Sequence, residues 1–319
     1  MEIKQDGARQ EKLRNVLLLL VRLGLWGDRE EHNTRLNLTE EDWNDVFRLA
    51  MQHTVTGLAF QGVSHLPDSQ IPPQSLLVRW MAETDAVERR NRKMNGVLGQ
   101  LYNIFHEKGL NPILQKGQGV ANYYESPLLR VCGDIDLYFN NKKAWDDALD
   151  FLRKNNITFV KQADEGISYR WQGVDIEHHS RLFDLYNPFL QGFVGKLEGQ
   201  KGYRHTALST YPSVIVTTPS PFLDILLQSL HILKHSVSRG IGLRQMCDMA
   251  RSCYKLHGEI DSEEMKAVCK KIGLHRWCPL LHTFLIDYLG LPKDCLPYED
   301  TAPSAAPLAE IVWRGGNFG

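Results

Sequence analysis

The chain has 319 residues, of which 43% are hydrophobic and 24% are charged, and its formal net charge is -1. This length is sufficient for two or three domains and a sizeable core. A charge so close to zero argues against a nucleic-acid-binding surface spread over the whole molecule, although it allows a local basic groove.

Six cysteines are scattered along the chain without Cys-x-x-Cys spacing. This distribution is typical of reduced thiols in a cytosolic protein and not of a disulfide framework. The longest apolar run near the start, residues 16–21, is too short to cross a bilayer, and no small-residue cleavage site follows it. We therefore expect a cytoplasmic protein with no signal peptide and no membrane association.

Residues 1–108 are predicted to form an N-terminal helical region, because apolar residues recur at intervals of three and four. Thr39 is expected to cap the second helix, with Asp42 in the reciprocal position of a capping box. The charged run 88–93 is expected to be a solvated helix face. The predicted elements are a helix around 13–23, a helix from 40 to about 53, a loop at 67–73 and a long helix over 75–106.

The pattern changes at Gly109, where apolar runs of strand length begin to alternate with helical stretches. This alternation indicates an α/β or α+β unit, which we place at residues 109–182. A tight turn at Gln172 and Gly173 predicts an antiparallel meander within a mixed sheet of about five strands. The predicted strands are 113–115, 131–139, 157–161, 167–171 and 174–179, and the predicted helices are 119–124 and 142–154.

Residues 183–319 are predicted to be mainly helical, with one apolar segment at 211–218. Pro221 is compatible with a helix because it would lie in the first turn. The predicted helices are 219–237, 243–256, 262–272 and 276–289, followed by a proline-rich linker or surface wrap at 292–307.

Two aspartates interrupt one of the apolar runs, where Asp134 and Asp136 alternate with Ile135 and Leu137. Side chains two residues apart in a strand point to the same face, so both carboxylates would lie together. Such a pair is costly to bury unless it surrounds a divalent cation. A strand end that reaches solvent would also accommodate the pair.

A glycine turn upstream of this strand favours the cation. Gly117 and Gly119 would let backbone N–H groups approach a triphosphate, at the start of a helix whose dipole attracts anions. Lys116 and Arg130 are candidate phosphate partners. Together these residues indicate a site for a nucleotide and a metal ion.

The last strand of the meander provides a third carboxylate. Asp175, Glu177 and His179 occupy alternate positions and share one face. Beside the two aspartates, a third carboxylate would complete a triad able to hold two Mg²⁺ ions, which prefer oxygen ligands. Two such ions stabilise the attacking and leaving oxygens of an in-line phosphoryl displacement.

These features resemble the nucleotidyltransferase superfamily that includes DNA polymerase β and the aminoglycoside nucleotidyltransferases. More closely, residues 116–137 read K-G-x-x-x-A-x-x-Y-x-x-P-x-x-R-x-x-x-D-I-D-L and are similar to the uncharacterised bacterial nucleotidyltransferase-like family. That family also tends to carry an acidic-x-His-x-x-Leu strand and an early W-x-x-x-x-x-x-A-x-x-H helix. The first pattern is matched by Glu177, His179 and Leu182, and the second by Trp43, Ala50 and His53.

The resemblance implies an α+β fold, with a nucleotidyltransferase-type mixed β-sheet module flanked by N- and C-terminal helical regions. It implies Mg²⁺-dependent transfer of a nucleoside monophosphate from an NTP to a hydroxyl or amine of a small-molecule or protein acceptor. Asp134 and Asp136 would be metal ligands, and Glu177 would be the third carboxylate, which activates the acceptor. Asp175 is the alternative, but the histidine and leucine that follow favour Glu177.

One departure from the wider superfamily concerns the turn, where many active members have a serine after the glycine. Gln118 stands there in this chain, which keeps open a second reading: a catalytically inactive protein that binds nucleotides or a partner. The predicted nucleotide-binding residues are Lys116, Gly117, Gln118, Gly119, Arg130 and Lys234.

His231, Lys234 and His235 share one face of the predicted helix 219–237 and are expected to line a cleft or to pack in the core. The resemblance implies that Lys234 reaches a triphosphate. Asp248 is expected either to pair with Arg244 within its helix or to point into the cleft. A third class of function, a zinc hydrolase, would use His178, His179, His231 and His235.

Overall fold

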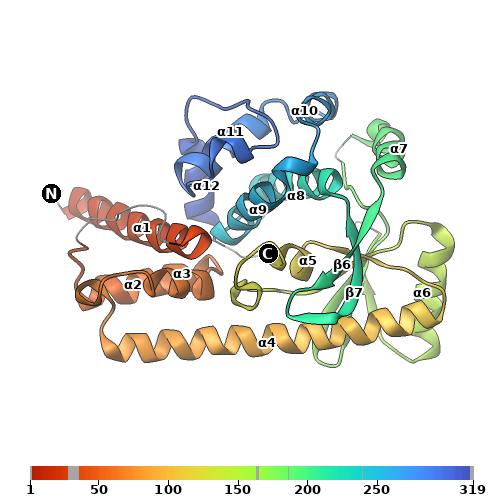
Figure 1. The fold of residues 1–319 in the computed structure, drawn as a ribbon, viewed down its shortest axis with the longest axis horizontal. Coiled ribbons are helices and arrows are strands. Elements are labelled where there is room, and N and C mark those ends of the chain that lie inside the picture. The colour runs from red at the N-terminus through yellow and green to blue at the C-terminus, as the bar shows by residue number, and fades with distance from the viewer. Residues whose placement is uncertain (1, 28–35, 163–164, 186, 239, 317–319) are drawn as a thin grey trace.

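A mixed β-sheet lies at one end of the molecule, and a long helix, α4 (Gln74–Glu107), extends from it to the N-terminal helices (Figure 1). The computed structural model describes residues 2–27, 36–162, 165–185, 187–238 and 240–316. Within these residues the sheet has seven strands, in the order β3-β4-β5-β2-β1-β7-β6. The strands are β1 (Ile113–Gln115), β2 (Ile135–Tyr138), β3 (Phe159–Lys161), β4 (Ile167–Trp171), β5 (Val174–His179), β6 (Tyr203–Leu208) and β7 (Tyr211–Pro219).

The strand β2, which carries the second aspartate, lies between β1 and β5 in the middle of the sheet. It pairs antiparallel with β1 and parallel with β5. In this register Asp136 lies beside Gln115 on one side and beside Glu177 on the other. Because directly paired residues on neighbouring strands point to the same face, these three side chains form one row across the sheet.

The expected number of strands was too low, because β6 and β7 join the sheet next to β1. The segment 211–218, predicted only to be apolar, belongs to β7, which runs parallel to β1 and antiparallel to β6. The strand β6 has no clear apolar alternation, because it is an edge strand and most of its residues are exposed or half-buried.

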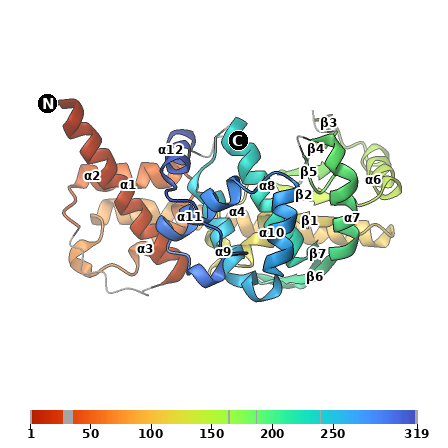
Figure 2. The ribbon, with the colours of Figure 1, turned by 90° about the horizontal axis from the view of Figure 1, so that it is seen from above.

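The helices of residues 221–315 lie between the N-terminal helices and the sheet (Figure 2). Besides α4, the longer helices of the described residues are α1 (Glu2–Trp26), α2 (Glu40–Gln52), α3 (Thr56–Val63), α6 (Lys142–Lys154), α7 (Gln191–Lys201), α8 (Pro221–Ser238), α9 (Leu243–Leu256), α10 (Ser262–Lys271), α11 (Trp277–Asp287) and α12 (Ala306–Gly315). A five-residue helix, α5 (Gly117–Ala121), follows β1 directly.

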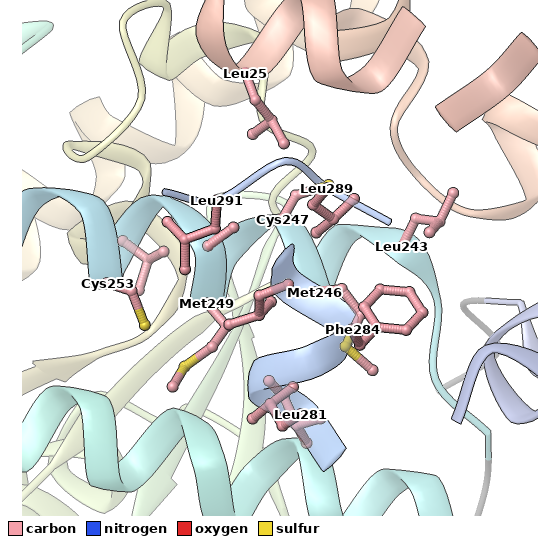
Figure 3. Close-up of a cluster of buried hydrophobic side chains, with 14 of the residues drawn as sticks. Leu25, Leu243, Met246, Cys247, Met249, Cys253, Leu281, Phe284, Leu289 and Leu291 are labelled. Carbon is pink, nitrogen blue, oxygen red and sulfur yellow. The ribbon is translucent and has the colours of Figure 1, made fainter. Parts of the chain in front are cut away.

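Two clusters of buried apolar side chains stabilise this arrangement. The larger one joins residues of the N-terminal helices, such as Leu17, to residues of the C-terminal helices. Figure 3 shows part of it, where Met246 of α9 meets Phe284 of α11. The smaller cluster packs α4 and α6 onto the sheet through side chains such as Phe105 and Phe151. The two helical regions that were predicted separately therefore share one core.

Several local predictions are confirmed. The capping box of α2 is present, because Thr39 Oγ1 accepts a hydrogen bond from the Asp42 amide and Asp42 accepts one from the Thr39 amide. The proline-rich stretch 292–307 combines exposed residues with buried ones, and Cys295 and Tyr298 are among the buried residues. All six cysteines are buried and none forms a disulfide. No helix among the described residues is both long and apolar enough to cross a membrane.

Candidate active site

A cleft of about 980 Å³ is lined by the sheet and by the C-terminal helices α8 and α9, and this volume is at the upper end of the range typical of ligand pockets. Thr54 and Arg90, from the N-terminal helical region, also line it. The cleft thus draws residues from all three predicted regions. The predicted site residues that line it are Lys116, Gly117, Arg130, Asp134, Asp136, Glu177, His179, His231, Lys234, His235 and Asp248.

Asp136, Glu177 and His179 form a cluster in this cleft. One oxygen of each carboxylate and one ring nitrogen of His179 all lie within 4.8 Å of one another. The distance between His179 Nε2 and Asp136 Oδ1 is 2.7 Å. The cluster arises because Asp136 and Glu177 are direct neighbours in the β2–β5 register, while His179 lies two residues further on the same face of β5.

Asp134 lines the cleft one residue before β2 but is not part of this group of three. Repulsion from Asp136, and then burial, raise the pKa of Asp134 to about 6. Burial also opposes ionisation of Asp136, but Lys116 and His179 outweigh it and lower the pKa of that carboxyl below its usual range. A cation bound beside both carboxylates would relieve their repulsion.

Lys116 is held in a strained backbone conformation beside this cluster. Its φ is 48° and its ψ is -137°, a region that glycine adopts far more readily than lysine. Its Nζ lies 3.4 Å from Asp136 Oδ1. Gly117, the next residue, has a φ of +40°, which accounts for the glycine at this turn. The strained backbone therefore belongs to the residue whose side chain reaches Asp136.

Comparing two substitutions of Lys116 tests this strain. Lys116→Gly and Lys116→Ala both remove the ammonium group, but only glycine adopts the observed backbone conformation without strain. We expect the glycine variant to have a free energy of unfolding about 1 kcal/mol higher than the alanine variant, in urea denaturation. An alanine variant of equal or greater stability would contradict this explanation.

Glu177 and Asp175, the two candidates for the third carboxylate, lie in different surroundings. Glu177 lines the cleft, and its Oε1 accepts a hydrogen bond of 2.9 Å from Gln162 Nε2. Asp175 is exposed, is not among the cleft residues and lies 3.7 Å from Arg170. Of these two acids, only Glu177 is near Asp136.

The turn after β1 presents fewer residues to the cleft than was predicted. Gln118 is only 3% exposed and does not line the cleft, and both polar atoms of its side chain lack a hydrogen-bond partner among the described residues. Gly119 faces β7 instead, where an added Cβ would lie 3.5 Å from Thr218 Cγ2. The helix α5 that follows has only five residues, so its dipole is small.

Arg130 and Asp248 form a buried ion pair at the edge of the cleft. Arg130 Nε and Nη2 donate to the two oxygens of Asp248, over 2.9 and 2.6 Å. Tyr124 also donates to Asp248, over 2.8 Å. Asp248 lines the cleft, as one of its two alternatives predicted, and its ion pair is with Arg130. The Arg130 guanidinium is occupied by this pair.

Several cleft residues were not predicted as functional. Arg90 and Arg244 donate to the carbonyls of Gly133 and Val131, respectively, and so hold the loop that leads into Asp134. Gln115 is 3% exposed, lines the cleft, and its Nε2 has no hydrogen-bond partner among the described residues. Arg90 lies in a charged run whose pattern indicates only a solvated helix face, so the sequence carried no signal for it.

The face of α8 that carries His231, Lys234 and His235 lines the cleft as one of its two alternatives predicted. The two imidazole rings lie 4.3 Å apart, and Lys234 Nζ lies 2.6 Å from Asp184 Oδ2. His178 points to the opposite side of the sheet, where it contacts Phe139 and the hydroxyl of Tyr169. The four histidines that a zinc hydrolase would use therefore do not form one cluster among the described residues.

The fold is α+β, with a seven-stranded mixed sheet flanked by helices in the described residues. The model of a family described as uncharacterised nucleotidyltransferase matches residues 39–286, so this chain belongs to that family. Among solved structures, the chain is similar to an antigenic nucleotidyltransferase-like protein from Paracoccidioides brasiliensis, with 15% identity and a TM-score of 0.39 over 62% of this chain and 92% of that chain. No curated protein matches this chain.

Proposed function

We propose that this protein is a divalent-metal-dependent nucleotidyltransferase that moves a nucleoside monophosphate from an NTP to an acceptor hydroxyl or amine. The observation that carries the proposal is the cluster of Asp136 and Glu177 within 4.8 Å, in a cleft of about 980 Å³. Two neighbouring carboxylates fit Mg²⁺ or Mn²⁺, which prefer oxygen ligands. Family membership supports the same class of reaction.

Different residues of the cleft would have different roles in this reaction. Asp136 and Asp134 would hold the metal, which supplies charge stabilisation to the attacking and leaving oxygens. The acceptor atom forms a bond to the α-phosphorus, and the bond from that phosphorus to pyrophosphate breaks. Glu177 would take the acceptor proton at a carboxylate oxygen that does not bind the metal, and pyrophosphate leaves with the electron pair of the broken bond.

The cations of the cleft would bind the triphosphate. Lys116 is next to Asp136 and would exchange this partner for a phosphate oxygen, and Lys234 is within reach of the same cleft. We assign Arg130 a positioning role, because Asp248 occupies its guanidinium. We assign no phosphate contact to the side chain of Gln118, because it does not line the cleft.

The acceptor is proposed to be a small molecule or a protein, and the location to be the cytoplasm. A nucleic-acid acceptor is disfavoured by the net charge of -1. The free state of all six cysteines supports a reducing compartment.

The test is to incubate the whole chain with Mg²⁺ or Mn²⁺ and each NTP labelled at the α-phosphate, with sugars, aminoglycosides and protein extracts as acceptors. Labelled acceptor together with pyrophosphate release, absent in Asp136→Asn, is the expected result. Calorimetric titration with a non-hydrolysable NTP should accompany it. Binding without pyrophosphate release would replace the proposal by the alternative, a catalytically inactive nucleotide-binding protein. If the chain neither binds the nucleotide nor releases pyrophosphate, both the proposed function and its alternative are wrong.

A further inference from the structure

We propose that His179 is itself a ligand of the metal in this cleft, and that the site consequently prefers Mn²⁺ to Mg²⁺. This inference rests on the proposed function, which requires a metal but does not specify a nitrogen ligand. The compact group of potential ligands is Asp136, Glu177 and His179, and Asp134 lies outside it. The inference therefore concerns which side chains complete the site.

The distances within the group fit one shared ion. His179 Nε2 lies 2.7 Å from Asp136 Oδ1 and 3.8 Å from Glu177 Oε2. Ligand atoms bound at about 2.1 Å to one ion, at right angles in an octahedral site, are about 3 Å apart. The observed distances lie on either side of that value, so small side-chain movements would suffice for both acids and the imidazole to bind one ion.

The donor set decides between metals. Mg²⁺ binds oxygen ligands and rarely an imidazole, whereas first-row transition ions bind both carboxylates and imidazole. Among these ions Mn²⁺ is the one whose preference for carboxylate and phosphate oxygens is closest to that of Mg²⁺. Two carboxylates and one imidazole in a nucleotide site therefore favour Mn²⁺.

A second observation indicates that this place receives an oxygen-bearing ligand. Gln115 is the direct neighbour of Asp136 on β1, is 3% exposed and lines the cleft. Its Nε2 has no hydrogen-bond partner among the described residues. A buried N–H group without a partner is costly, and a phosphate oxygen or a metal-bound water at the cluster would satisfy it.

The position of Lys116 is compatible with its replacement by the metal ion at Asp136. Its Nζ lies 3.4 Å from Asp136 Oδ1, the same atom that contacts His179. A divalent ion at this oxygen would repel the ammonium group, which could then turn to the phosphates of the nucleotide. Binding of the metal and readiness of Lys116 for phosphate would thus be coupled.

The experiment is titration of the whole chain with Mn²⁺, followed by electron spin echo measurements on the bound ion. A histidine ligand produces a ¹⁴N modulation, which should change to that of ¹⁵N when the chain is made with ¹⁵N-histidine. His179→Gln should abolish the modulation and weaken Mn²⁺ binding at least about tenfold, with less effect on Mg²⁺. His231→Gln, which removes another cleft histidine, should keep the modulation.

The outcomes separate the inference from the proposed function. Bound Mn²⁺ that is lost in Asp136→Asn but shows no histidine nitrogen in the wild-type chain would overturn the inference and leave the proposed function standing. A modulation that disappears in His231→Gln and not in His179→Gln would overturn it as well. Failure of the wild-type chain to bind Mn²⁺ or Mg²⁺, with or without NTP, would overturn both. The nitrogen modulation of Mn²⁺ bound to the wild-type chain tests the inference even if a variant does not fold.

Discussion

Replacing Asp136 with asparagine is expected to lower the rate of nucleotidyl transfer at least about a thousandfold, which corresponds to about 4 kcal/mol of lost transition-state stabilisation. Asp136 is at the centre of the cluster, where it contacts Lys116 and His179 and neighbours Glu177. Asparagine keeps the shape of the side chain but not its charge. The rate of pyrophosphate release at saturating NTP and metal is the measurement.

A matched control lies on the neighbouring strand. Asp175→Asn also removes one carboxylate, but that side chain is exposed and away from the cleft, so we expect the rate to change less than twofold. Urea denaturation of both variants should show that each remains folded. Equal loss of activity in the two variants would show that net charge, and not the cluster, explains the effect.

The carboxylates of the site could be predicted because strand geometry determines which side chains share a face. Alternation along a strand placed Glu177 and His179 on one side, and the D-x-D spacing did the same for the two aspartates. Periodicity does not specify which strands pair or in which register. The parallel pairing of β2 with β5 brings Glu177 to Asp136. Asp175 lies two positions before Glu177 on the same strand, and this offset separates the alternative from the cluster.

Other parts of the site depend on long-range contacts that leave no local pattern. The unpaired amide of Gln115 becomes meaningful only when β1 is placed beside Asp136. Arg90 belongs to a charged helix segment, and helical periodicity cannot show that one arginine of this segment bonds a loop residue, Gly133, far along the chain. The edge strand β6 was missed for a related reason, since only one of its residues is buried and its sequence carries no clear apolar alternation.

The ion pair between Arg130 and Asp248 is another long-range contact that leaves no local sequence pattern. Breaking it is expected to have the largest effect on stability. Arg130→Met should lower the free energy of unfolding by about 3–5 kcal/mol, because it leaves a buried carboxylate without its cation. Arg130 is 6% exposed and Asp248 is 6% exposed. Urea denaturation measures the loss, and Arg153→Met provides the comparison, because its pair with Asp150 is exposed and should contribute less than about 0.5 kcal/mol.

A double-mutant cycle separates the unpaired charge from the lost packing. Asp248→Asn removes the charge but can still accept the hydrogen bond of Tyr124, so adding it to Arg130→Met should restore part of the lost stability. Additive losses would show that packing and not the charge pair explains the effect. Because Arg130 also donates to the Val131 carbonyl, the folded fraction of Arg130→Met should bind Mn²⁺ more weakly than the wild-type chain. If Arg130→Met and the wild-type chain bind Mn²⁺ equally, the ion pair contributes only to stability. The loop before Asp134 then keeps its position without Arg130.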